Sequence, residues 1–119
     1  MSVKKVPFNE GVQVFVDHLT DKSRSPNTIR AYARDIAQIG DELAPLMGVS
    51  SREEIDLAAV TTDDLAVAFR RHGSARAKST STRADSSRAR TMACWSKFFS
   101  ELVRKKKLPS SPMDGVDPP

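Results

Sequence analysis

The chain has 119 residues, enough for one domain with a single core and too few for that core plus a separate catalytic module. Its one cysteine, Cys94, excludes an intramolecular disulfide and a cysteine-rich metal site. The formal net charge is +4, no apolar run is long enough to span a bilayer, and the amino end lacks the apolar stretch of a signal peptide. We therefore expect a cytoplasmic protein that does not enter a membrane.

A first helix is predicted over 8–19, after an N-terminal tail at 1–7. Its apolar residues follow the i, i+3, i+4, i+7 spacing of one buried stripe: Val12, Phe15, Val16 and Leu19. The polar residues 20–24 then predict a short loop.

A second helix is predicted over 26–44. Ser25 can cap its free backbone N–H groups, and Pro26 suits the first helical position, where its missing donor does not matter. Ile29, Tyr32 and Ile36 lie on one face, which should be buried. The opposite face carries Asn27, Arg30, Arg34 and Gln38. Pro45 and Gly48 end the helix, and the acidic residues 50–56 predict a loop or a short helical turn.

A third helix is predicted over 62–72, because Thr61 or Thr62 can cap it and two aspartates follow in its first turn. Leu65, Ala68 and Phe69 form its small apolar face. Gly73 is expected to stop the helix, and residues 74–82, which are rich in Ser and Thr, predict a flexible basic loop. No stretch alternates as a strand does, so the chain is predicted to be all-α.

The last predicted helix, over 82–106, carries a core stripe with Trp95, Phe99 and Leu102. Twelve Lys and Arg stand against two acids between residues 70 and 107, so this helix has almost no acids to pair with its cations. Four cations recur every seven residues, which returns to nearly the same side of a helix. These residues form a predicted basic ridge: Arg83, Arg90, Lys97 and Arg104. A DNA-binding surface is favoured over a merely solvated one, since a solvated helix face normally mixes both signs.

The expected core comprises Phe15, Leu19, Ile29, Tyr32, Ile36, Leu65, Phe69, Trp95, Phe99 and Leu102. Cys94 lies off the core stripe, with no apparent base to activate its thiol. His18 and His72 have no further ligand at metal-binding spacing, so both are read as surface or capping residues. We expect neither a metal, nor another cofactor, nor a catalytic constellation.

Two stretches resemble the tyrosine recombinases, or phage-type integrases, which include the Xer resolvases. SPNTIRAYARDI, residues 25–36, is similar to the family's Ser-x-Asn-Thr motif followed by Tyr, a basic residue and Asp. WSKFFSELVRKKKLPSSP, residues 95–112, resembles the closing helix of the same domain, with Ser111 where the family usually has Asn. The resemblance covers nearly all of residues 8–119. It implies a four- to five-helix SAM-like core-binding domain at 8–108, followed by a Pro-rich linker at 109–119 toward a catalytic domain.

In that family the second and fourth helices face the DNA major groove. The resemblance therefore implies contacts to duplex DNA by Arg30 and Arg34, with Asn27 and Thr28 near a phosphate, beside the ridge residues. The family's catalytic residues belong to a second domain, and Tyr32, the only tyrosine, is read as core, so no strand cleavage is expected of this chain alone. Family members act as tetramers, whereas the isolated domain should be monomeric.

One alternative function remains open from the sequence. Residues 35–64 are strongly acidic, and such a segment in a helical module can bind a basic surface on a protein partner. The cations at residues 105–107 are equally ambiguous, because positive charges also stabilise the end of a helix without any ligand.

Overall fold

The computed structural model describes residues 5–77 and 84–116, with only the helical backbone at 73–77 and 84–88. It contains four α-helices: α1 (Phe8–Asp21), α2 (Pro26–Leu46), α3 (Thr62–Ala77) and α4 (Ala84–Arg104). Short 3₁₀ turns lie between α2 and α3 and after α4: η1 (Arg52–Glu54), η2 (Leu57–Ala59) and η3 (Pro112–Gly115). No strand forms within the described residues, so the predicted all-α class is confirmed.

α2 and α3 begin where local capping chemistry predicts. Ser25 Oγ accepts a hydrogen bond from the Thr28 amide at 3.2 Å, and Pro26 is the first residue of α2. At the start of α3, Thr61 Oγ1 accepts from the Asp64 amide at 3.1 Å. Both predicted helix starts are therefore confirmed.

The predicted end of the third helix is wrong. Gly73 does not stop α3, which continues to Ala77 and so includes part of the expected loop at 74–82. Glycine inside a helix costs only about 1 kcal/mol relative to alanine, which tertiary context readily overrides. The rest of that expected loop, residues 78–82, lies outside the described residues.

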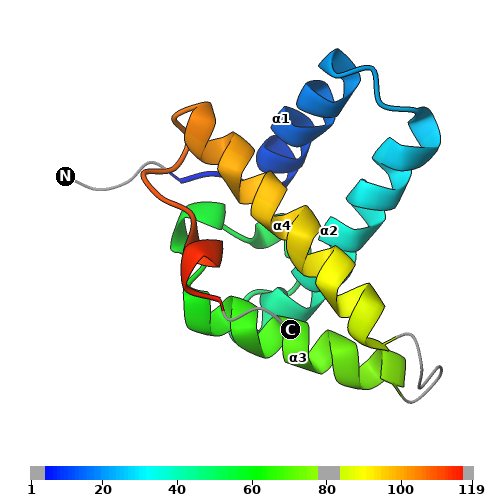
Figure 1. Cartoon of the computed structure of the whole chain (residues 1–119). Coiled ribbons are helices and arrows are strands. Elements are labelled where there is room, and N and C mark those ends of the chain that lie inside the picture. The colour runs from blue at the N-terminus through cyan, green and yellow to red at the C-terminus, as the bar shows by residue number, and fades with distance from the viewer. Residues whose placement is uncertain (1–4, 78–83, 117–119) are drawn as a thin grey trace.

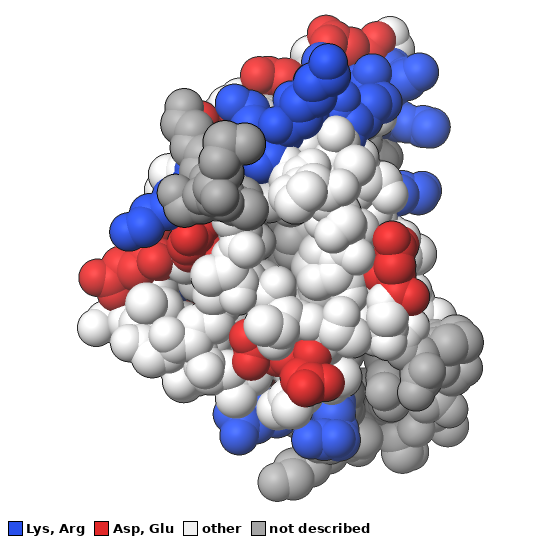
Figure 2. All heavy atoms as spheres, turned by 90° about the vertical axis from the view of Figure 1, so that its left-hand side faces the viewer, with Lys and Arg blue, Asp and Glu red and all other residues white. Residues whose placement is uncertain are grey.

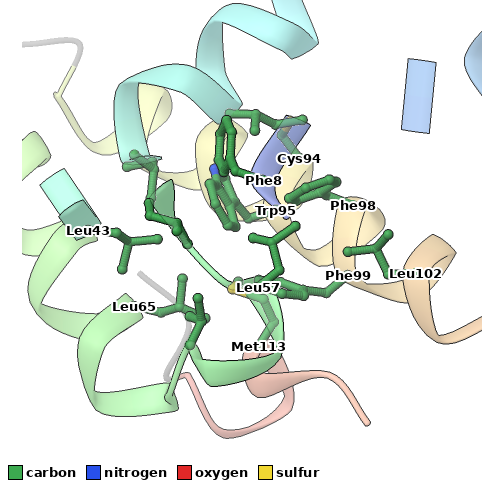
Figure 3. Close-up of a cluster of buried hydrophobic side chains, with 14 of the residues drawn as sticks. Phe8, Leu43, Leu57, Leu65, Cys94, Trp95, Phe98, Phe99, Leu102 and Met113 are labelled. Carbon is green, nitrogen blue, oxygen red and sulfur yellow. The ribbon is translucent and has the colours of Figure 1, made fainter. Parts of the chain in front are cut away.

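α4 runs diagonally across the molecule and contacts the other three α-helices (Figure 1). Its buried face carries Trp95, which packs edge-on against Phe98 with ring centroids 5.2 Å apart, and Phe99 beside them. Leu57 of η2 and Met113 of η3 fall in the same cluster (Figure 3). α4 is therefore the element around which the core is assembled.

Eight of the ten expected core residues are buried: Phe15, Leu19, Ile36, Leu65, Phe69, Trp95, Phe99 and Leu102. Ile29 and Tyr32 are only half-buried, because the first turns of α2 extend beyond the centre of the core. Cys94, expected off the core stripe, is buried, and its thiol lies 3.7 Å from the Tyr32 carbonyl of α2. Burial raises the pKa of the Cys94 thiol to about 12, which makes the residue chemically inert.

Ordered packing begins before residue 8 and continues beyond residue 108. Val6, in the segment assigned to a tail, is buried, and its amide donates to Asp56 Oδ1 at 2.9 Å. In the segment assigned to a linker, Met113 is buried and the Pro112 carbonyl accepts from Thr62 Oγ1 at 2.7 Å. Val6 thus packs on η2, and Pro112 and Met113 pack near the start of α3.

Candidate nucleic-acid interface

The N-terminal half of α2 presents short polar side chains whose hydrogen bonds are local. Thr28 Oγ1 accepts from Ser25 Oγ at 2.9 Å, which ties both hydroxyls to the helix start. Arg30 Nη2 donates to Asn27 Oδ1 at 2.6 Å, and both of these side chains are exposed. The free end of α2 therefore combines the positive end of the helix dipole with an arginine held by its neighbour, an arrangement suited to an anion.

Arg34 is exposed and makes no hydrogen bond or ion pair with any residue that the structure describes. Tyr32 is the residue of this segment that faces α4, since its hydroxyl and its carbonyl both contact that helix. Arg30 and Arg34 are each two residues from Tyr32, hence about 160° around the helix from it. These two arginines therefore point away from α4.

Arg90, on α4, reaches across to α2. Its Nε lies 3.4 Å from Asp35 Oδ2, and its Nη2 donates to Asp35 Oδ1 at 3.5 Å. The Asp35 side chain is 7% exposed and that of Arg90 is 64% exposed. The ion pair thus joins a buried acid to a guanidinium that still faces solvent. Because Asp35 is buried, it is not part of an exposed acidic surface formed by residues 35–64.

Arg104 forms a two-pronged ion pair with Glu101 of its own helix. Its Nη2 and Nε donate to the two carboxylate oxygens at 2.6 and 3.0 Å, and the Glu101 side chain is 5% exposed. His18 Nδ1 of α1 lies 3.4 Å from the same carboxylate. The hydrogen bonds from Arg104 lower the pKa of Glu101, although burial alone would raise it.

Although α4 carries few acids, two of its ridge cations have an acidic partner. Glu101 supplies a partner from within α4, and Asp35 supplies one from α2. The second acid could not be seen on the helix itself, because the partners are 55 residues apart in the chain.

Lys97 is the described member of the basic ridge that pairs with no acid in the described residues. Its Nζ donates to the Tyr32 hydroxyl at 3.3 Å and lies 5.7 Å from the centre of the Tyr32 ring, within the range of a cation–π contact. Arg83, the first member of the ridge, lies outside the described residues.

A groove lies between the C-terminal half of α1, the start of α2 and α4. It has a volume of about 420 Å³. The Tyr32 ring, Lys97 and Arg104 line one side, and the α1–α2 loop contributes Lys22 and Arg24. The polar composition of residues 20–24 predicted only a loop, and both cations were missed as candidates. The signal that could have found them is two basic residues within three positions of the Ser25 cap.

The end of α4 carries a separate group of cations. Residues 105–107 are exposed lysines, and Lys107 Nζ lies 3.7 Å from Glu10 Oε1 of α1. Figure 2, which views the side of the molecule where α4 ends, shows many Lys and Arg gathered at the top, with uncharged residues and separate Asp and Glu patches below them. This group lies at the helix end, where positive charge is also favourable without a ligand.

Within residues 5–77 and 84–116, no three His, Cys, Asp or Glu side chains come close enough to hold a metal ion. None of the helices described there is both long and apolar enough to cross a membrane.

Comparison with known proteins identifies the architecture. The model of one family, the phage integrase N-terminal SAM-like domain, matches residues 12–106. The chain belongs to this family. No curated protein and no solved structure matches it. The family match includes most of α1 and all of α2, α3 and α4, and it supports a role in recombination or integration.

The seven described candidates occupy two surfaces of this SAM-like domain. Arg30, Arg34 and the exposed Asn27 lie on the outer side of α2, away from α4. Thr28 lies on the other side of α2, about 40° around the helix from Tyr32, toward the surface that carries the α4 candidates. Those candidates are Arg90, Lys97 and Arg104, and each of them is in contact with another side chain.

Proposed function

We propose that the chain binds double-stranded DNA as the N-terminal core-binding domain of a tyrosine recombinase, and that it does not cleave DNA by itself. The proposed contacts are Asn27, Thr28, Arg30, Arg34, Arg83, Arg90, Lys97 and Arg104. In the full recombinase, protomers assemble as a tetramer on paired DNA sites, whereas the isolated domain is a monomer.

One observation carries the proposal. Arg34 on α2 and Lys97 on α4 are exposed cations that have no acidic partner in the described part of the chain. They lie on α2 and α4, the two helices that should face DNA according to the resemblance to integrases. A partner with closely spaced negative charges is the ligand that compensates such cations, and duplex DNA carries one phosphate charge per about 1.7 Å of its axis.

The ion pairs of α4 are compatible with DNA contact. Arg104 uses Nε and Nη2 on Glu101, which leaves the two N–H donors of Nη1 for a phosphate oxygen. Arg90 is likewise more than half exposed beyond its contact with Asp35. Each buried carboxylate would then hold its guanidinium in one place, which reduces the side-chain entropy lost on binding.

The test is fluorescence anisotropy on a labelled duplex at several salt concentrations. Wild-type affinity should be weak, about 1 μM to 0.1 mM, and should fall steeply as salt rises. The salt slope is the slope of log affinity against log salt concentration. If both residues contact phosphates, the Arg34→Gln/Lys97→Gln double variant should lose roughly two units of this slope. Loss of a base contact would instead cost about 1–3 kcal/mol on the cognate site only.

The matched control is Arg70→Gln/Arg71→Gln, which removes the same charge from exposed side chains of α3 that have no acidic partner among the described residues. It should retain the wild-type salt slope. Equal binding by wild type and both double variants, or salt-insensitive binding, would contradict the proposal. Formation of a covalent protein–DNA adduct by the purified chain would contradict its non-catalytic part.

A further inference from the structure

The groove between α1 and α4, which we name the α1–α4 groove, concentrates charge of one sign. Four cations line it: Lys22 and Arg24 from the α1–α2 loop, and Lys97 and Arg104 from α4. Among the described residues that line it, the one acid is Glu101, which is buried and already bound by Arg104. Several cations in one cleft with low-dielectric walls focus their field on an anion, so this groove is suited to a negatively charged ligand.

The loop that supplies Lys22 and Arg24 has a defined shape. Its backbone turns back onto α1 through three hydrogen bonds: Lys22 N to His18 O, Ser23 N to Thr20 O and Arg24 N to Leu19 O, each 3.0 Å long. Ser23 has φ = 59°, in the left-handed region that completes the turn. The loop therefore places its two cations opposite α4 without needing to fold around a ligand first.

Neither loop cation is used within the domain. The Lys22 and Arg24 side chains make no hydrogen bond or ion pair with the residues that the structure describes, and both are exposed. On the opposite wall, Lys97 and Arg104 are seven residues apart, hence about 10 Å along the axis of α4. A single small anion does not reach both ends of such a wall, whereas consecutive phosphates of one strand do.

We propose that the α1–α4 groove holds the phosphodiester backbone of one strand of the duplex, with Lys22 and Arg24 as phosphate-contacting residues. This inference rests on the proposed DNA binding and names further residues for it. Hydroxyl donors fit the same ligand, because Ser96 and Ser100 of α4 also line the groove. Contacts of this kind set affinity and position on DNA and do not read the base sequence.

The experiment compares Lys22→Gln/Arg24→Gln with the Arg70→Gln/Arg71→Gln control, so that both variants lose two charges. Anisotropy is measured on two duplexes of unrelated sequence, and circular dichroism checks that each variant folds. The groove variant should lose roughly two units of salt slope on both duplexes alike, while the control keeps the wild-type slope. The charge-retaining pair Lys22→Arg/Arg24→Lys should also keep it.

The outcomes separate this inference from the function on which it rests. If wild type binds DNA and Arg34→Gln/Lys97→Gln weakens binding while Lys22→Gln/Arg24→Gln behaves as the α3 control, the groove assignment is wrong and the function stands. If wild type does not bind duplex, both fail. A single-stranded oligonucleotide that binds as tightly as the duplex, with the same loss in the groove variant, would overturn the duplex as the ligand.

Discussion

α2 and α4 both present cations, but they hold them in different ways. On α4, Arg90 and Arg104 are bound to the buried carboxylates of Asp35 and Glu101. On the outer side of α2, Arg34 has no partner among the described residues, and Arg30 contacts only the amide of Asn27. Arg90 and Arg104 are therefore part of the packing of the domain, whereas Arg30 and Arg34 are surface charges without an acidic partner among the described residues.

This difference separates two contributions of a basic residue. Where an exposed guanidinium balances the charge of a buried acid, removing the guanidinium leaves that charge unpaired and destabilises the fold. A free arginine contributes to binding alone, and its substitution leaves the fold nearly unchanged. Mutations on the two helices should therefore separate effects on stability from effects on DNA affinity.

The largest expected effect tests whether the buried face of α4 holds this helix in the fold. Trp95 is fully buried and packs against Phe98 and Phe99, so Trp95→Ala should lower the free energy of unfolding by roughly 3–5 kcal/mol. Urea denaturation followed by circular dichroism measures this loss. Arg34→Ala is the control and should stay within about 0.5 kcal/mol of wild type. Equal stability of the two variants would show that α4 is not held through its core face.

The second prediction concerns the Glu101 ion pair. Glu101→Gln should reduce the free energy of unfolding at neutral pH by about 1 kcal/mol, because the hydrogen bonds from Arg104 lose their charged acceptor while solvent screens the exposed guanidinium. The pKa of Glu101 is lowered in the fold, so its contribution is complete above the unfolded glutamate pKa of about 4.3 and is lost as the pH falls through the folded value.

Wild type and Glu101→Gln should therefore converge in stability as the solution is acidified. Urea unfolding at a series of pH values from neutral to strongly acidic measures the difference directly. A gap that stays constant across that series would mean that the loss comes from packing and not from the charge.

How much of this could be predicted from sequence depends on the range of each interaction. The cap by Ser25 and Pro26 and the stripe through Trp95 and Phe99 depend on neighbours within two turns, and both were predicted correctly. The Asp35–Arg90 pair depends on where α4 crosses α2, and the spacing of residues along one helix carries no information about that crossing. The burial of Cys94 was missed for the same reason.

The residues that line the groove were likewise only partly predictable from the sequence. The seven-residue spacing predicted one strip of α4 for Arg90, Lys97 and Arg104; Arg90 and Lys97 both contact α2, and Lys97 and Arg104 both line the groove. Lys22 and Arg24 join that strip only because the backbone of the loop folds back onto α1. A loop conformation of this kind has no periodic signal in the sequence.

The third prediction compares one bound and one free arginine directly. Arg104→Gln and Arg34→Gln should each lower the salt slope of duplex binding by roughly one unit if each contacts one phosphate. Only Arg104→Gln should also lower the melting temperature, since only it removes an ion pair with a buried acid. The two measurements are anisotropy and thermal denaturation. If Arg104→Gln lowers the melting temperature and leaves the salt slope unchanged, its ion pair is purely structural and α4 presents fewer DNA contacts than proposed.

The smallest effect is expected for Tyr32→Phe, at the point where α2 and α4 meet. The substitution removes a hydroxyl 3.3 Å from Lys97 Nζ but keeps the ring, so the contact with Phe15 and the cation–π contact both persist. Lys97 pairs with no acid there, and its ammonium remains free to reach a phosphate. Duplex affinity and salt slope should therefore stay within about twofold and half a unit of wild type, as expected for one exposed hydrogen bond. Lys97→Gln in parallel should lose roughly one unit of slope. A tyrosine variant as impaired as the lysine variant would show that the hydroxyl itself binds DNA or positions Lys97 for it, and that α2 contributes to the interface through its inner side as well as its outer one.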